Sequence, residues 1–595
     1  MPGIVGFTTS AINKADCKRT LQEMQELITH DRSYKKDELF CAEHMCATRS
    51  HTDIVDRAPQ PYSESGIYVW LEGEFYNQAE LSGRTGVASS TDPALLASLF
   101  RRSPDLSFLK NIDGIFSAVI YDSAQQKVYL VTDRYGLQYM YWTLHGGGLA
   151  WGSEVKAMLA LPGFKPKIDR QATDEFLSIG YLLEDRTWFE GVELLSPGSV
   201  LIWDLEERSA ERYRYWWWDS IVTLGERVDL VDAAEELARI FKKAVEERSG
   251  PSDRVGASLS GGLDSRAVLA AIPDYGKPVP SVTFGKDRSA DVKIARMAAA
   301  VRGSPHYTMS LSGDNWLMPR LRGVWYTDGQ FDLMNMHGFE SAGEMKALFD
   351  ICMSGFLGDT MLGGSKLKNK EFFDVVNKNH IAAMMGCSPD LLGNFNLYAN
   401  LTKSDYYIFQ NRLRRYINLG VTLLQTAIVY RRPFCSNKLV EFAYSLPDSL
   451  RFHNKLYRVM LLDAFPEYFR TIPWQSSGVP ISWPQWAAKA AKVLNMAKSR
   501  GVGTLNRLGV RLSDPYHYTD YPNWIRQEPA SSFFQGLLAS PSALYPEYIS
   551  ETEVRSRLEK HLEGADFAID LCRYLTFELW LQQVFEGKYR EVDES

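Results

Sequence analysis

A short glycine-containing segment in the middle of the chain, residues 260–265 (SGGLDS), constrains the fold more than any other feature. It lies directly between a strand-like run, residues 255–259, and a helical run, residues 266–271. Further strand-like and helical runs then alternate at residues 279–284, 291–301 and 306–311. Strands that alternate with helices predict a doubly wound parallel sheet, with this segment at the end of one strand.

The composition of this segment suits the binding of phosphate. Gly261 and Gly262 let the backbone approach a ligand closely, so that successive N–H groups can converge on phosphate oxygens at the start of a helix. Ser260 and Ser265 add hydroxyl donors, whereas Asp264 would repel bare phosphate and therefore predicts Mg²⁺ between carboxylate and phosphate. The segment lacks the lysine of GxxxxGK[ST] loops. The alternative interpretation is an ordinary glycine turn after a strand.

The first two hundred residues have a different organisation. Short strand-like runs separated by turn residues, with helical stretches near residues 16–29 and 91–102, predict a layered α+β domain. The strand-like runs are residues 67–71, 117–121, 127–132 and 199–203. The aromatic stretch 211–219 (ERYRYWWWD) interrupts this pattern, and an amphipathic helix is predicted at residues 229–248. The predicted division is a domain at residues 1–210, a linker at 211–228 and a second domain at 229–595.

Composition excludes several classes of partner. The 595-residue chain carries a formal net charge of −7, which gives no electrostatic reason to expect nucleic acid or an anionic membrane as the main partner. The sequence shows no signal peptide and no window long enough to span a bilayer, so we expect a cytoplasmic protein. Seven scattered cysteines without a CxxC pair argue against a disulfide framework and against a zinc site.

Residues 260–265 resemble the pyrophosphate loop of the N-type ATP pyrophosphatases, which cleave ATP between the α and β phosphates. Residues 354–364 (SGFLGDTMLGG) resemble the SGEGSDExxGG element of asparagine synthetases, in which the aspartate, Asp359 here, helps to hold magnesium pyrophosphate. Residues 282–285 (VTFG) resemble the strand end that contacts adenine, and Arg432-Pro433-Phe434 resembles the RVPF element.

This resemblance implies ATP and Mg²⁺ as cofactors, with Asp264 and Asp359 as the catalytic, metal-holding carboxylates. It also implies a set of nucleotide contacts: Leu259, Ser260, Gly261, Gly262, Asp264, Ser265, Phe284, Gly285, Ser354 and Gly355.

The amino-terminal half resembles the class II glutamine amidotransferase domain of the same family, which implies an Ntn-type αββα sandwich. The family's glutamine-binding positions correspond to Arg49, Gly73, Glu74 and Asp92. The family's nucleophile is an N-terminal cysteine exposed when Met1 is removed, and here that position is Pro2, which has no nucleophilic side chain. Glu72 replaces the oxyanion-hole asparagine and would repel an oxyanion. We therefore predict a vestigial glutamine pocket without glutaminase activity; the alternative is that these residues only maintain the scaffold.

The synthetase half departs from the family pattern as well. Phe356 stands in place of a glutamate, Thr360 follows Asp359 in place of another, and Val429 matches the glutamate before RVPF. Residues 474–478 (WQSSG) contain no counterpart of the late catalytic lysine. No general base is evident, and for the remaining candidates ordinary surface roles are the alternative: Tyr326, Asp328, His337, Lys366 and Lys368.

The predicted function is an ATP-dependent ligase that adenylates a carboxylate, releasing pyrophosphate, and transfers the acyl group to an amine of a small molecule or peptide. Glutaminase-dead members of the family with this logic include β-lactam synthetase and the lasso-peptide cyclases. An ammonia-dependent asparagine synthetase, a peptide macrolactam (lasso-type) cyclase and a non-catalytic nucleotide-binding scaffold remain alternatives. A homodimer is one arrangement that the sequence leaves open.

Overall fold

The computed structural model describes residues 2–86, 91–225, 228–367, 369–484, 486–494, 497 and 517–590.

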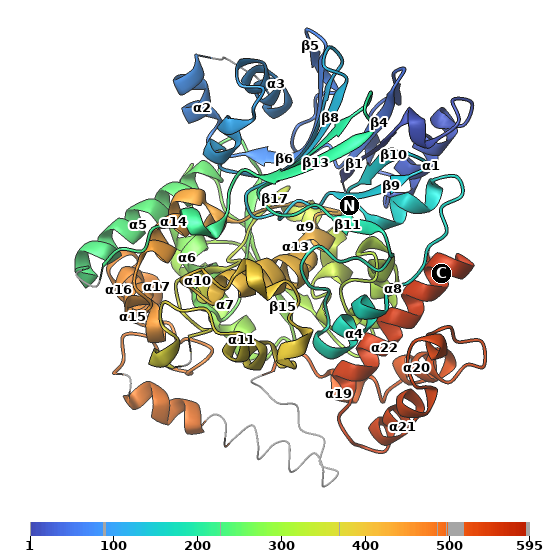
Figure 1. The fold of residues 1–595 in the computed structure, drawn as a ribbon. Helices are drawn as coiled ribbons and strands as arrows, with labels where there is room; N and C mark the ends of the chain where they lie inside the picture. The colour runs from blue at the N-terminus through green and yellow to red at the C-terminus, as the bar shows by residue number, and fades with distance from the viewer. Residues whose placement is uncertain are drawn as a thin grey trace.

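The amino-terminal half contains two antiparallel sheets, with strand orders β11-β9-β10-β1-β4-β2 (β3 also pairs with β4) and β13-β12-β8-β7-β6-β5 (Figure 1). The first sheet comprises β1 (Gly3–Thr8), β2 (Lys35–Lys36), β3 (Phe40–Cys41), β4 (Met45–His51), β9 (Tyr141–His145), β10 (Gly148–Gly152) and β11 (Val192–Leu194). The second comprises β5 (Tyr62–Glu64), β6 (Ile67–Phe75), β7 (Gly114–Asp122), β8 (Lys127–Thr132), β12 (Ser199–Asp204) and β13 (Ser209–Arg214). The accompanying α-helices are α1 (Cys17–Leu27), α2 (Gln78–Thr85), α3 (Asp92–Arg102) and α4 (Arg170–Ile179).

Alternation of side chains along the strands explains why these sheets pack against each other. In β1, Ile4 lies in the core between the sheets, whereas Val5 lies in the outer core that contains α1. In β6, Trp70 joins the same inter-sheet core, whereas Leu71 packs under α3. Because successive strand residues point to opposite faces, both sheets bury both faces, and the result is an αββα sandwich.

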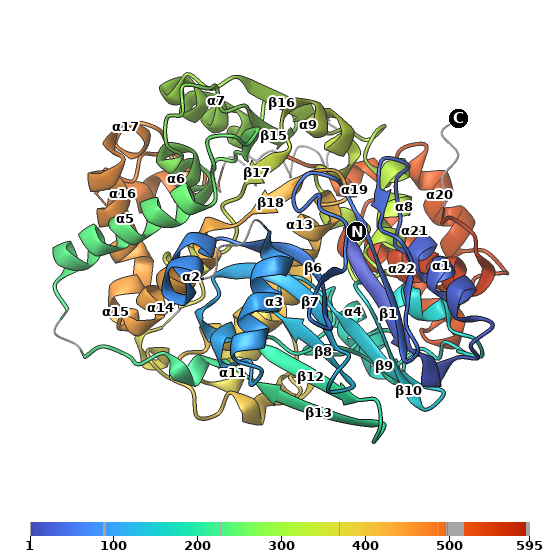
Figure 2. The same ribbon diagram turned by 90° about the horizontal axis from the view of Figure 1, so that it is seen from above.

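The second half is built on a parallel sheet with the order β16-β15-β14-β17-β18 (Figure 2). Its strands are β14 (Val255–Ser258), β15 (Ser281–Gly285), β16 (His306–Ser310), β17 (Ile351–Met353) and β18 (Val429–Arg431). The chain runs outwards from β14 to β15 and β16, then returns to β17 on the other side of β14. In doubly wound sheets, ligands bind in the crevice at the carboxyl ends of strands that flank such a switch point. The β14–β17 pair is the switch point here.

Helices surround this sheet and connect the two halves. The helices used below are α5 (Leu230–Glu247), α6 (Leu263–Ala271), α7 (Ala290–Arg302), α8 (Leu317–Tyr326), α10 (Gly358–Met361), α14 (Asn437–Ser445), α16 (Lys455–Ala464), α19 (Tyr521–Trp524), α20 (Ala530–Leu538), α21 (Glu551–Leu562) and α22 (Ala568–Leu581). The apolar stripe of α5 packs on α14 and α16. The C-terminal helix α22 contacts α8 of the second half and α4 of the first.

The predicted fold class is confirmed, with two local differences. Helix α6 begins at Leu263, earlier than predicted, because the second half of the glycine segment forms its first turn. Strand β13 pairs with β12, so the antiparallel sheet continues past residue 210 into the predicted linker. All seven cysteines are free, as expected.

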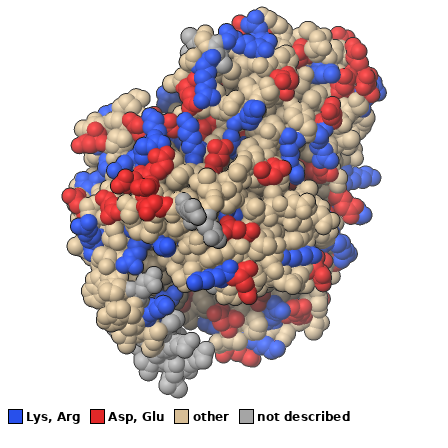
Figure 3. Space-filling view, turned by 60° about the vertical axis from the view of Figure 1, so that its left-hand side comes forward, with Lys and Arg blue, Asp and Glu red and all other residues tan. Residues whose placement is uncertain are grey.

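Within the described residues, none of the helices combines the length and apolar character that a bilayer crossing requires. Figure 3 shows acidic and basic side chains interspersed over one face of the molecule rather than gathered by sign.

Candidate functional site

The two glycine-rich segments meet at the switch point of the parallel sheet. Residues 259–265 follow β14 and residues 354–358 follow β17, and these strands are hydrogen-bonded neighbours. A Cβ on Gly355 would lie only 2.7 Å from the backbone N of Ser265, and one on Gly358 would lie 2.5 Å from Cγ of Asp264. Side chains at either position would force the segments apart, so both glycines are needed for this contact.

The predicted phosphate loop, residues 260–265, is held in shape by its own side chains. Ser265 Oγ accepts a hydrogen bond from Ser260 N at 3.1 Å, and Ser260 Oγ accepts one from Gly262 N at 3.2 Å. Gly261 N donates at 2.8 Å to the carboxylate of Asp291, at the start of α7. An anionic oxygen therefore already occupies the position opposite this N–H group, as a phosphate oxygen would.

Asp264 and Asp359 lie next to each other at the switch point, Asp264 half-buried and Asp359 exposed. Asp264 Oδ2 accepts from Asp359 N at 2.6 Å, and Oδ1 accepts from the hydroxyl of Tyr457 at 2.9 Å. Burial, followed by the charge of Asp359, raises the pKa of Asp264 to about 7. Two neighbouring carboxylates repel each other when both are ionised, and a divalent cation bound between them would compensate this repulsion.

This donor set fits Mg²⁺ bound together with a nucleotide. Within the described residues there is no group of three or more His, Cys, Asp or Glu side chains placed to hold a metal on their own. Mg²⁺ does not require such a cage, because it is usually held by one or two carboxylates plus phosphate oxygens and waters.

The remaining predicted nucleotide contacts line the neighbouring strand ends. Leu259 N donates to Val282 O at 2.7 Å, which joins the phosphate loop to β15. Phe284 is half-buried at the end of β15, and Gly285 follows with φ of +131°. Ser354 N donates to Arg431 O at 3.0 Å, so this residue is fixed to the end of β18.

The segment that lacks the late lysine lies directly on the phosphate loop. Gln475 N donates to Gly261 O at 3.1 Å, and a Cβ on Gly261 would lie 2.5 Å from Cβ of Gln475. Leu263 of the loop also lines a cavity of about 250 Å³ beside Trp474. Three cationic side chains line the same cavity: Arg458, Lys489 and Lys492.

The positions that depart from the family pattern have no acid–base chemistry. Phe356 is buried, and the guanidinium of Arg432 lies 5.7 Å from its ring centre. Val429 begins β18, and Thr360 lies within the short helix α10. None of these three side chains can remove a proton from an amine.

The polar side chains of the predicted glutamine pocket make hydrogen bonds within the protein. Arg49 is buried and donates to Asp37 Oδ2 at 2.8 Å, to Ala58 O at 3.0 Å and to Asp56 O at 3.2 Å. Asp92 accepts from Phe75 N at 2.9 Å. Burial raises the pKa of Glu72 to about 7, against the opposing charge of Arg49.

Glu74, the residue expected in that pocket, instead pairs with the synthetase half. Arg431 donates to its two carboxylate oxygens at 2.9 and 2.6 Å, and also to Asp253 Oδ2 at 2.6 Å. Gly73, with φ of +118°, would bring a Cβ within 2.1 Å of Ile115 O, so its role is to let β6 pass β7 closely. Through Arg431, whose carbonyl accepts from Ser354 N, Glu74 is therefore connected to the predicted nucleotide site.

The other candidates are dispersed. Tyr326 donates to His30 O at 2.9 Å, and Asp328 accepts from Val155 N at 2.8 Å, so both join the two halves. The alternative of an ordinary surface role is wrong for Asp328, because this residue is only 1% exposed. His337 lies near the end of β15, Lys366 lies in a turn after α10, and Lys368 is outside the described residues.

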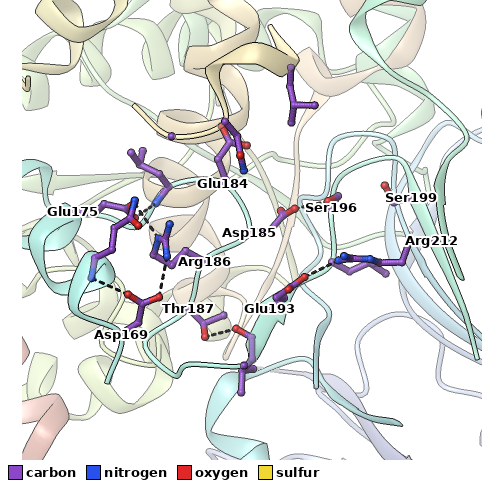
Figure 4. A pocket seen from close by; sticks show the side chains of 18 of the residues that line it. Asp169, Glu175, Glu184, Asp185, Arg186, Thr187, Glu193, Ser196, Ser199 and Arg212 are labelled. Carbon is purple, nitrogen blue, oxygen red and sulfur yellow. Dashed lines mark hydrogen bonds and ion pairs between the residues drawn. The ribbon is translucent and has the colours of Figure 1, made fainter. Parts of the chain in front are cut away.

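A separate cavity of about 800 Å³ lies away from the switch point (Figure 4). Several of its charged side chains pair with one another: Arg186 pairs with Asp169 at 2.9 Å and with Glu175 at 3.1 Å, and Arg212 pairs with Glu193 at 2.6 Å. Because these charges are already satisfied, we assign no site to it.

Sequence reasoning missed several residues that surround Asp264 and the segment 260–265. Arg431 directly precedes the RVPF-like element, and Asp291 stands at the start of a predicted helix. The sequence could therefore have indicated both residues. Tyr457 and Gln475 carry no local signal, because they reach the loop only through the tertiary fold.

Comparison with known proteins agrees with this organisation. A family model described as "Glutamine amidotransferase domain" matches residues 1–216, and one described as "Asparagine synthase" matches residues 236–419. Amidase chry2 of Gibberella zeae is 27% identical over 282 residues, which cover 45% of this chain and 41% of that protein. The glutamine-hydrolysing asparagine synthetases of Gallus gallus and Mus musculus are 27% and 26% identical, over 42% of this chain and 45% of each relative. The chain thus spans less than half the length of these relatives.

Proposed function

Because the chain is a member of the asparagine synthetase family, we propose that it is an ATP-dependent ligase that adenylates a carboxylate and transfers the acyl group to an amine. The observation that carries this proposal is the meeting of Asp264, Asp359 and the 260–265 loop at the switch point. An anion-binding loop beside two carboxylates matches the needs of a magnesium–triphosphate ligand.

In the proposed first step, a carboxylate oxygen of the substrate attacks the α-phosphorus of ATP. The bond from that phosphorus to the bridging oxygen breaks, and pyrophosphate leaves with the electron pair. The N–H groups of the loop stabilise the charge that grows on the leaving group, and Mg²⁺ held by Asp264 and Asp359 would supply charge neutralisation there. Arg458, Lys489 and Lys492, which line the cavity next to Leu263, supply positive charge on the side where the family's lysine is missing.

In the second step, the amine nitrogen attacks the acyl carbon, AMP leaves, and the nitrogen loses a proton. We propose that the amine belongs to the substrate, because Pro2 supplies no nucleophile for glutamine hydrolysis and the carboxylate of Glu74 is paired with Arg431. The substrates would then be a small molecule or peptide that carries the acid, and one that carries the amine.

The test is to incubate the protein with labelled ATP, Mg²⁺ and a panel of acids and amines, and to measure AMP and pyrophosphate. Acid-dependent AMP formation that is lost in Asp264→Ala and Asp359→Ala, but kept in Asp274→Ala, an exposed turn residue, supports the proposal. A requirement for high ammonium would indicate the ammonia-dependent synthetase. ATP binding without cleavage in every mixture would contradict the ligase and favour the scaffold, in agreement with Phe356 and Val429.

A further inference from the structure

A chain of buried polar side chains ends beside the carboxyl end of β15. It starts at Arg320, which is fully buried and pairs with Glu340 at 3.2 Å. Arg320 Nη1 lies 2.8 Å from the hydroxyl of Tyr521, and that hydroxyl lies 3.0 Å from Nδ1 of His337. The other ring nitrogen, Nε2, lies 3.1 Å from the hydroxyl of Tyr518.

The guanidinium fixes the direction of the first hydrogen bond, and the tautomer of His337 sets the direction of the other two. A guanidinium can only donate, so the Tyr521 oxygen accepts from Arg320; we assign to His337 the tautomer in which Nδ1 accepts the single proton of Tyr521. Burial, and next the charge of Arg320, lower the pKa of His337 to about 3, so the imidazole is neutral. With Nδ1 accepting, the network assigns the proton to Nε2, which donates to the Tyr518 oxygen. Among the residues that the structure describes, the hydroxyl proton of Tyr518 then has no acceptor in this network.

Tyr518 lies where the nucleotide base is expected. Its carbonyl accepts from Lys286 N at 3.1 Å, and a Cβ on Gly285 would lie 2.8 Å from its own Cβ. Burial, and next the charge of Asp291, raise the pKa of Tyr518, and Asp291 is the carboxylate that accepts from Gly261 N of the phosphate loop. The phenol thus stands between the end of β15 and the phosphate loop, and it is only partly buried.

We propose that Tyr518 is a base-recognition residue, whose hydroxyl donates a hydrogen bond to an acceptor nitrogen of the adenine ring. Tyr521 and His337 are positioning residues that hold this hydroxyl as a donor. This inference rests on the proposed ATP site, and it assigns a role to the segment after residue 516 that no motif predicted.

The test measures the dissociation constant of Mg–ATP by calorimetry for the full chain. Tyr518→Phe removes only the hydroxyl, and we expect ATP to bind about 5- to 15-fold more weakly, the usual effect of one lost hydrogen bond. Tyr545→Phe is the matched control, because it removes a buried tyrosine hydroxyl that donates to Leu538 O at 2.8 Å in the C-terminal segment; its ATP affinity should not change.

Base analogues identify the acceptor. ATP analogues in which ring nitrogen 1, 3 or 7 is replaced by carbon each lack one acceptor. One of them should bind the wild type and Tyr518→Phe equally, because its partner atom is absent in both. If all three analogues lose affinity on the substitution as ATP does, the proposed contact is wrong.

The role of His337 is tested through its polarity. His337→Gln can accept from Tyr521 and donate to Tyr518, so it should keep most of the ATP affinity, whereas His337→Ala should weaken it as Tyr518→Phe does. If the wild type binds ATP and Tyr518→Phe binds it equally well, only this inference is refuted. If the wild type itself does not bind ATP, the proposed function is refuted with it.

Discussion

Replacing Asp264 by asparagine should make the ligand-free protein more stable while removing its activity. In the folded protein the pKa of Asp264 is raised from 3.8 to about 7, by burial first and then by the charge of Asp359. The folded state therefore holds a proton that the unfolded state releases at lower pH. The stabilisation that this proton gives is complete below pH 3.8 and is lost as the pH rises to about 7.

The magnitude follows from the size of the shift. Each pH unit between the two pKa values costs about 1.4 kcal/mol, so the upper limit is about 4 kcal/mol at pH 8. Asp264 keeps part of its surface in contact with solvent, and screening should reduce this to about 2 kcal/mol. Asparagine has nearly the same shape, can accept the hydrogen bond from Asp359 N, and does not ionise.

The assay is thermal unfolding in EDTA without nucleotide at pH 5 and pH 8. The gain in melting temperature of Asp264→Asn over the wild type should be about 1–2 °C larger at pH 8 than at pH 5. The control Asp274→Asn removes the same charge from an exposed turn and should show no such difference. If Asp264→Asn gains equally at both pH values, or is less stable at pH 8, the reasoning about the carboxylate pair is refuted.

Three further experiments probe the surroundings of this pair. Mg²⁺ should bind with ATP up to about tenfold more weakly for each pH unit below 7, because Asp264 must lose its proton to hold the metal. Calorimetry in buffers of different ionisation enthalpy should detect about one released proton. If no proton is released, a Mg²⁺ site at this pair is contradicted. Gly355→Ala should abolish pyrophosphate release, since the new Cβ would lie 2.7 Å from Ser265 N; normal activity would show that the segments are not in contact. Glu74→Gln should raise the KM for ATP, because it weakens the pair that fixes Arg431; an unchanged KM would argue against that coupling.

Much of this architecture could be predicted from sequence because it depends on local patterns. The alternation of strands and helices around residues 255–311 predicts the parallel sheet, and two glycine-rich segments after strands predict which strand ends carry the proposed site. The pairing of Glu74 with Arg431 could not be predicted, because it joins residues 357 positions apart and depends on how the two halves dock. The contact between Tyr518 and His337 could not be predicted for the same reason, because the two residues are 181 positions apart.

The location of helix α22 has a consequence for how such a chain can evolve. Arg573 on this helix donates to the carbonyl oxygens of Leu177 and Ser178 in the first half, both at 3.0 Å, and Trp580 shares one hydrophobic core with residues of both halves. Deletion of the amino-terminal half would expose that core and also free Arg431 from Glu74. Selection for the proposed ATP site alone would therefore be sufficient to preserve the amino-terminal half, whatever chemistry that half still performs.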